Sequence, residues 1–319
     1  AVQNRSLSMP RKFGQDIIRR WKENPVITSE DIPFKCHDMY NAGCIKIDGE
    51  YLLLITIEKL DGRPAIFRAR SEDGLFFEIE REPFIASSTD VDFKEYEEMG
   101  VLDARITALN DEFYIVYLAM GRHGIVLELG KTKDFKEFER IEIISQPDTK
   151  AGALFPRKIN GRFALLEKPK YGESIWIAYS NDLLTWGERE VVLTPRAGFW
   201  DQGRIGCAVP PMETESGWLL FYYGVKKTSA GTITKIGAAI LDKEDPAKVI
   251  NRSIIPILSP RKLYERIGDL NNVVFSTGAI LEDNGEIKLY YGAADNCICL
   301  GTTTLSEIID FCKNDLEEF

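Results

Sequence analysis

Gly217 to Tyr223 (GWLLFYY) is the stretch that decides the fold. It starts with a turn residue and continues as an almost unbroken run of aromatic and aliphatic side chains, which is typical of a β-strand covered on both faces. The same pattern recurs at Gly49 to Ile55 (GEYLLLI), Asp111 to Leu118 (DEFYIVYL), Gly161 to Leu166 (GRFALL) and Gly285 to Tyr291 (GEIKLYY). Repetition of one strand pattern at these five places predicts five similar β-units.

A second repeated element lies between these strands and joins a polar turn to an aromatic residue. In each copy an Asp can accept hydrogen bonds from the backbone of the turn, and the aromatic side chain can then pack under the next strand. Intervals of this size, with about four short strands each, are typical of propeller blades. The sequence therefore predicts an all-β fold, a five-bladed β-propeller. The copies are Ser71 to Phe77, Thr132 to Phe138 and Ser180 to Trp186, with a looser version at Leu241 to Pro246.

Helices are expected only at the two ends of the chain. Phe13 to Trp21 (FGQDIIRRW) and Leu305 to Cys312 (LSEIIDFC) carry apolar residues at helical spacing, and Thr304 or Ser306 can cap the second segment. We expect a helical extension over residues 1–23 and a C-terminal helix over residues 304–319, both on the outside of the propeller. No linker or low-complexity tract divides the chain, so residues 1–319 are predicted to form one domain.

Composition limits the class of protein. The 319 residues are 44% apolar and 28% charged, as in ordinary globular proteins. The 40 Lys and Arg residues against 50 Asp and Glu give a net charge of −10, which argues against nucleic-acid binding because phosphate contacts need a basic face. No apolar run approaches the ~20 residues that cross a bilayer, so no membrane association is predicted. With this charge balance, a neutral or locally recognised small ligand is expected. Because no apolar signal core follows the N-terminal basic residues, we expect a cytoplasmic location.

Neither a metal site nor a disulfide framework is predicted. The six cysteines form no C-x-x-C pair, so reduced thiols are expected. Cys297 and Cys299 fit alternate positions of one strand better than a pair of metal ligands. Only His37 and His123 could supply imidazole, which makes a histidine-based zinc site improbable.

The functional site must be sought as a constellation, because a propeller gathers the inner strand ends of all its blades around one channel. Asp103 is the candidate for acid chemistry, since a carboxyl in a half-buried cleft can have a raised pKa and act as a general acid. From spacing alone, a pairing of Asp103 with Arg105 or a turn cap is the simpler interpretation. The polar residues beside apolar strand runs are Asn41, Asp103, Arg105, Lys150, Arg157, Lys168, Asp201, Arg204 and Asp295.

Two further features bear on ligand binding. Lys150, Lys168 and Arg204 would form an anion site if they met in a channel without acidic partners. Separately solvated surface cations are the simpler alternative. Trp200 stands in a loop, where an aromatic side chain is more apt to face a ligand than one in a strand, and it is the best candidate to stack on a sugar ring.

Several stretches of the chain resemble glycoside hydrolase family 130, which contains the inverting β-mannoside phosphorylases. They follow in order from about Asn24 to the C-terminal helix. The resemblance implies a five-bladed propeller, in agreement with the repeats, and cleavage of a β-mannoside by inorganic phosphate with inversion to α-mannose 1-phosphate. Phosphate would be a co-substrate, and no cofactor is implied. The stretches are Asn24 to Thr28, Tyr40 to Gly43, Leu154 to Gly161, Gly217 to Gly224 and Tyr290 to Asp295.

The resemblance also implies roles for individual residues. Asp103 takes the position of the catalytic Asp, which donates a proton toward the glycosidic oxygen directly or through a substrate hydroxyl. Phosphate replaces the activated water of an inverting hydrolase, so one carboxylic acid suffices. Ala104 replaces the proline of the usual Asp-Pro-Arg motif, and Thr56 stands where many relatives have Arg. The implied sugar-binding residues are Asn41, Arg105 and Asp295, with Trp200 added from its loop position, and the implied phosphate-binding residues are Lys150, Lys168, Arg204 and Tyr223.

Alternatives stay open at this point. A β-1,4 linkage is favoured over β-1,2, with a manno-oligosaccharide, a mannosyl-glucose or a mannosyl-N-acetylglucosamine as substrate. A hydrolase of the same fold would need a carboxylate base such as Glu58, Glu97 or Asp201. A third alternative is a sugar-binding propeller without catalysis. The terminal helices could mediate a homo-oligomer, although a monomer is equally compatible.

Overall fold

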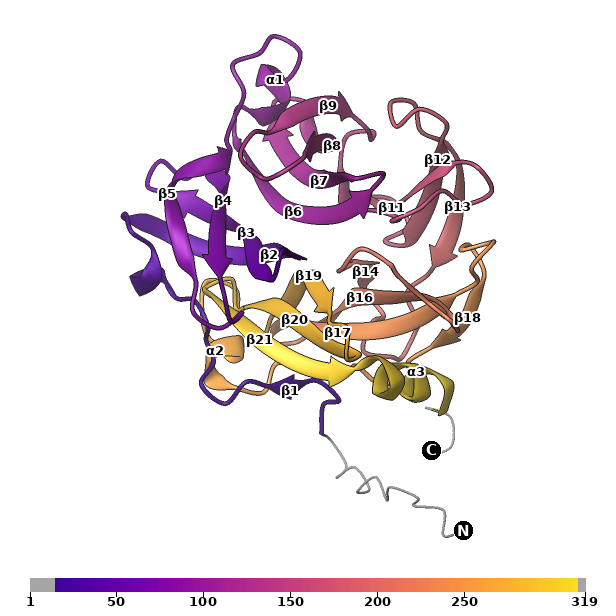
Figure 1. Ribbon diagram of the computed structural model, residues 1–319. Helices are drawn as coiled ribbons and strands as arrows, with labels where there is room; N and C mark the ends of the chain where they lie inside the picture. The colour runs from indigo at the N-terminus through magenta and orange to yellow at the C-terminus, as the bar shows by residue number, and fades with distance from the viewer. Residues whose placement is uncertain (1–14, 315–319) are drawn as a thin grey trace.

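The computed structural model describes residues 15–314, whose five antiparallel sheets stand in a ring like the blades of a propeller (Figure 1). The predicted five-bladed propeller is confirmed. Blade I contains β2 (Cys36–Ile47), β3 (Glu50–Lys59), β4 (Pro64–Ser71) and β5 (Glu78–Ile85). Blade II contains β6 (Gly100–Leu109), β7 (Glu112–Gly121), β8 (Gly124–Thr132) and β9 (Glu139–Ile143).

The other three blades complete the ring. Blade III contains β10 (Thr149–Leu154), β11 (Phe163–Pro169), β12 (Ile175–Ser180) and β13 (Gly187–Leu193). Blade IV contains β14 (Arg204–Cys207), β15 (Met212–Thr214), β16 (Gly217–Thr228), β17 (Gly231–Leu241) and β18 (Val249–Arg252). Blade V contains β19 (Val274–Leu281), β20 (Glu286–Ala293), β21 (Cys297–Thr304) and the N-terminal strand β1 (Arg19–Arg20).

The five apolar runs form β3, β7, β11, β16 and β20, and β3 explains their composition. Leu53 and Ile55 are fully buried against side chains of blade V, whereas Leu52 and Leu54 are buried against those of blade II. Successive side chains of a strand point to opposite faces of the sheet. Because each blade is packed between two others, both faces must be apolar and the strand loses the usual alternation.

The repeated polar turns join the third and fourth strands of their blades. In the first copy Asp73 Oδ1 accepts the backbone N–H groups of Leu75 and Phe76 at 2.8 and 3.0 Å. Asp182 makes the equivalent bonds in blade III, and the following Trp186 is buried in the core. The prediction of Asp-capped turns followed by a packed aromatic residue is therefore confirmed.

The helical extension expected over residues 1–23 is wrong for residues 15–23, and its first 14 residues lie outside the part of the chain that the structure describes. Residues 19–20 form β1, the outermost strand of blade V, where they pair antiparallel with Gly301 and Thr302 of β21. Asn24 adds two side-chain hydrogen bonds of 2.8 Å to the backbone of Leu300. The exposed edge of β21 offers backbone partners from far along the chain, and this tertiary pairing overrides the local helical pattern.

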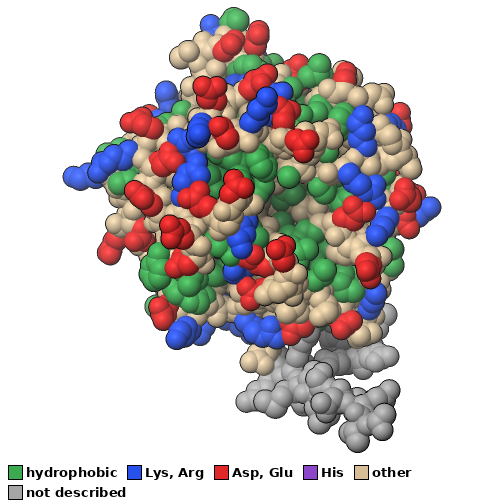
Figure 2. All heavy atoms as spheres, in the orientation of Figure 1, with side chains coloured by type: hydrophobic (Ala, Val, Ile, Leu, Met, Phe, Trp, Pro, Cys, Tyr) green, Lys and Arg blue, Asp and Glu red, His purple; other side chains and the backbone are tan. Residues whose placement is uncertain are grey.

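The C-terminal helix expected over residues 304–319 is confirmed over α3 (Leu305–Asn314), which buries Ile308, Ile309 and Phe311, and residues 315–319 lie outside the described part. The expectation of helices only at the ends is wrong, because α1 (Lys94–Glu97) and α2 (Leu263–Arg266) lie in connections between blades, and η1 (Ser29–Asp31) is a single 3-10 turn. No helix within residues 15–314 is long and apolar enough to span a membrane. Figure 2 shows acidic and basic side chains interspersed over one face.

Candidate active site

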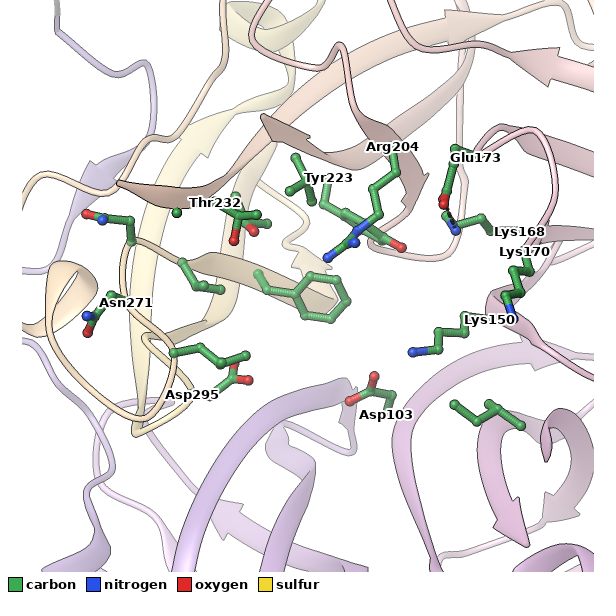
Figure 3. A pocket seen from close by; sticks show the side chains of 18 of the residues that line it. Asp103, Lys150, Lys168, Lys170, Glu173, Arg204, Tyr223, Thr232, Asn271 and Asp295 are labelled. Carbon is green, nitrogen blue, oxygen red and sulfur yellow. Dashed lines mark ion pairs between the residues drawn. The ribbon is translucent and has the colours of Figure 1, made fainter. Parts of the chain in front are cut away.

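A cavity of about 690 Å³ brings together residues that are far apart in the sequence (Figure 3). It is lined by Asp103 of blade II, Lys150 and Lys168 of blade III, Arg204 of blade IV, and Asp295 of blade V. All five were predicted site residues. The cavity also contains Tyr223, whose ring lies 5.0 Å from that of Phe275.

Shifts in the strand register of the innermost strands direct side chains toward the cavity. The register shifts between Tyr40 and Ala42 in β2, between Leu102 and Arg105 in β6, and between Lys150 and Ala153 in β10. Such bulges bend a strand and redirect its side chains. The residues at the shifts have left-handed backbones, with φ values of 49° at Asn41, 57° at Asp103 and 53° at Ala151. Asn and Asp adopt this conformation more readily than most residues.

Asp103 is held at three points. Its backbone N–H donates to Thr56 Oγ1 at 3.0 Å, and its Oδ1 atom accepts from Asn41 Nδ2 at 2.7 Å. Its carbonyl oxygen is 3.5 Å from the Arg105 guanidinium. Burial raises the pKa of the Asp103 carboxyl, although Arg105, Asn41 and Lys150 each oppose that rise. A carboxyl that is half-buried in a cavity and has a raised pKa is suited to donate a proton.

The cavity has two walls of opposite charge. Lys150, Lys168, Lys170 and Arg204 form the basic wall, which comes from blades III and IV, and Figure 3 shows them opposite Asp295. Within residues 15–314, Lys150 and Arg204 have no carboxylate partner in an ion pair, whereas Lys168 pairs with Glu173 and Lys170 with Asp148. These two cations leave positive charge on this wall that no carboxylate among residues 15–314 neutralises, and such charge favours contact with an anion.

The acidic side of the cavity is centred on Asp295, at the start of the turn between β20 and β21. Burial raises the pKa of Asp295 to about 7, and the nearby carboxylates of Asp103, Asp269 and Asp38 add to the rise. A carboxyl of this kind can donate or accept hydrogen bonds near neutral pH.

Two predicted sugar-binding residues lie behind the cavity surface. Arg105 is only 2% exposed, and its guanidinium donates to the carbonyl oxygens of Ala208 and Cys207 at 2.8 and 2.9 Å. It anchors the strand beneath Asp103. Asn41 is 6% exposed and has one partner-free atom, Oδ1, beside the Asp103 carboxyl.

Trp200 does not line the cavity, so its predicted role in stacking on a sugar is wrong. It is 7% exposed, its ring stacks on Tyr222 at 5.5 Å, and its Nε1 donates to the carbonyl oxygen of Ile254 at 3.0 Å. Gly224 and Gly237 leave the space for the indole, because a Cβ at either would lie within 2.6 Å of it. The loop position suggested exposure, but these two glycines allow the loop to fold inward.

The residues considered as hydrolytic bases are not placed for that chemistry. Glu97 is fully buried and bound by Arg140 and Tyr117, and Asp201 is fully buried and bound by Arg196, Arg252 and Tyr222. Glu58 is not among the residues lining the cavity. Arg157 was predicted only as a polar residue at a strand end. It pairs with Glu213 and does not line the cavity.

Sequence reasoning missed several cavity residues. Lys170 and Glu173 flank the turn between β11 and β12, and Thr232 lies near the tip of the long β16–β17 hairpin. The signal for Lys170 was its position directly after Lys168-Pro169, at the same strand end. No local pattern marks Thr232, because it reaches the cavity through the length of its hairpin. Within residues 15–314 no group of three or more His, Cys, Asp or Glu side chains is arranged to hold a metal ion.

Comparisons with known proteins identify the family. The family profile described as beta-1,4-mannooligosaccharide phosphorylase matches residues 9–314. The chain belongs to glycoside hydrolase family 130. The β-1,4-mannooligosaccharide phosphorylase of Ruminococcus albus is 30% identical over 311 residues, which cover 94% of this chain and 92% of that protein.

Other relatives within the family carry different names. The β-1,2-mannobiose phosphorylase of Listeria innocua is 31% identical and covers 92% of this chain and 97% of its own length. Its solved structure with β-1,2-mannobiose superposes with a TM-score of 0.84, covering 93% of this chain and 99% of that one. A 4-O-β-D-mannosyl-D-glucose phosphorylase of Bacteroides fragilis is 26% identical. The named relatives are all phosphorylases, but of different mannosides.

Proposed function

We propose that this protein is an inverting phosphorylase of β-mannosides that produces α-D-mannose 1-phosphate. The observation that carries the proposal is the pairing, in one cavity, of a half-buried carboxyl of raised pKa with a wall of cations. Asp103 supplies the donor, and Lys150 and Arg204 supply positive charge with no carboxylate partner among residues 15–314. The family relatives named as phosphorylases support the same reaction class.

The chemistry follows from the two walls. A mannosyl unit held near Asp295 places its glycosidic oxygen toward Asp103, whose carboxylate is oriented from behind by Asn41. The Asp103 carboxyl donates its proton to the departing oxygen, directly or through a sugar hydroxyl. Phosphate, bound by Lys150 and Arg204, attacks the anomeric carbon from the opposite face. Configuration inverts, and no second carboxylate is required because the nucleophile already carries negative charge.

For the substrate we propose a β-1,4-linked manno-oligosaccharide or a β-mannosyl-glucose, with β-1,2-mannobiose as the competing choice. The matching profile and one relative of 30% identity carry a β-1,4 description, while three relatives of 31 to 36% identity are named for the β-1,2 linkage. A hydrolase is less favoured, because two of the three candidate bases are fully buried within structural ion pairs.

The test is incubation of the purified protein with β-1,4-mannobiose or β-1,2-mannobiose, with and without inorganic phosphate. We expect mannose 1-phosphate of α configuration, formed only when phosphate is present and mainly from one linkage. Free mannose formed without phosphate would make the protein a hydrolase. Binding of either disaccharide without any product would favour a sugar-binding propeller.

A further inference from the structure

The basic wall contains a carboxylate that the proposed reaction does not use. Glu173 lies in the turn between β11 and β12, and its Oε2 atom is 2.5 Å from Nζ of Lys168. Both residues line the cavity, and Figure 3 shows the carboxylate directed at the lysine. Since phosphate is an anion, a negative charge in the wall that would hold it opposes its binding.

The backbone of Glu173 is held firmly in this position. Its carbonyl oxygen accepts the N–H of Ile205 at 3.0 Å, which ties the turn to the strand that carries Arg204. The neighbouring Ser174 Oγ donates to the Gly172 carbonyl oxygen at 2.7 Å. Glu173 itself has a left-handed backbone, with φ of 50°. The fold therefore sets the backbone position of Glu173, from which its carboxylate reaches Lys168.

The two partners differ in exposure. The Lys168 side chain is 8% exposed, whereas that of Glu173 is 41% exposed. A buried ammonium is costly unless an anion or several acceptors compensate its charge. The Glu173 side chain can turn into solvent, but Lys168 stays inside the wall. The pair between Lys170 and Asp148 differs, because both side chains are about half exposed and 3.5 Å apart.

We propose that Glu173 is a built-in counter-anion that neutralises Lys168 until phosphate binds, and that it thereby lowers the affinity of the site for phosphate. The inference rests on the proposed phosphorylase function and adds a residue that sets the working phosphate concentration. Phosphate can contact the Lys168 ammonium in two ways. Either the Glu173 carboxylate moves away, or it stays and its repulsion weakens phosphate binding. Lys150 and Arg204 provide the initial attraction because neither has to be released from a partner.

The experiment measures the Kd of inorganic phosphate by calorimetry at fixed pH and ionic strength. The proteins are the wild type, Glu173→Gln and, as a matched control, Glu188→Gln. Glu188 pairs with Arg162 on the same blade but outside the cavity. Glu173→Gln should lower the Kd by ~10-fold, the effect of one charge beside a dianion in a water-accessible site. Glu188→Gln should leave it unchanged.

A double-mutant cycle tests the partner. In a Lys168→Ala background, Glu173→Gln should lower the phosphate Kd much less, because the ammonium for which phosphate and Glu173 compete is absent. Unchanged or weaker phosphate binding by Glu173→Gln, or an equal benefit in both backgrounds, would overturn the inference while the phosphorylase proposal stands. A wild-type protein and variants that all fail to bind phosphate would overturn both.

Discussion

Replacement of Asp103 by Asn is the most informative perturbation of the site. The carboxamide has nearly the same shape, its oxygen can still accept from Asn41 Nδ2, and the backbone bond to Thr56 is retained. The fold and the cavity should therefore be preserved, and only the transferable proton is lost. Positioned general acids contribute ~10²–10⁴-fold to rate, which corresponds to ~3–5 kcal/mol of transition-state stabilisation.

The assay compares two substrates in the presence of phosphate. With β-mannobiose the leaving sugar needs a proton, so Asp103→Asn should lower kcat by the full factor. With 4-nitrophenyl β-mannoside the leaving group departs as a stable anion, so the loss should be far smaller. Phosphate binding by calorimetry should be retained, and it should tighten at a pH where Asp103 is ionised, because a negative charge near Lys150 is removed. An equal loss on both substrates, with phosphate binding intact, would refute the assignment of Asp103 as the general acid.

Three further predictions follow from the same geometry. Lys150→Ala and Arg204→Ala should each raise the KM for phosphate by ~10-fold or more, and that for the sugar far less, in initial-rate measurements. Thr56→Val leaves the Asp103 N–H without its acceptor, so it should lower the free energy of unfolding by ~1–3 kcal/mol and also lower kcat. Thr56→Ser keeps the hydroxyl and should restore both quantities. The folded-state pKa of Asp295 lies at about 7, above the ordinary 3.8, so ionisation as the pH rises from about 4 to 7 destabilises the fold. Asp295→Asn should remove that loss, at most ~4 kcal/mol, as measured by urea unfolding across this pH range; identical pH profiles for variant and wild type would contradict it.

The blades could be predicted from the sequence because the same strand pattern is repeated in each of them. The run in β3 is apolar at consecutive positions because blade V covers one face and blade II the other, and this leaves a readable signature. The sequence did not suffice for β1. The apolar residues of the segment 13–21 follow helical spacing, at Phe13, Ile17, Ile18 and Trp21. The partner that turns residues 19–20 into a strand is β21, whose paired residues lie more than 280 positions later.

Some residues of the candidate site could be predicted from the sequence, and others could not. The cations of blades III and IV could be predicted as a set only through the family resemblance, because nothing local shows that Lys150 and Arg204 face one cavity. Trp200 failed because exposure was inferred from its loop. The decisive feature is the absence of a Cβ at Gly224 and Gly237, two strand positions that meet the indole only in the folded ring.

The bulges explain why the site forms at all. In a regular inner strand, alternate side chains point between blades and would bury Asp103 against its neighbours. The register shift in β6 redirects that side chain into the cavity, and it removes the Asp103 N–H from the ladder between strands. Thr56, on the neighbouring blade, accepts that N–H and so compensates for the lost ladder bond. The Thr56 hydroxyl therefore helps to fix the backbone of Asp103, the residue that we propose as the proton donor.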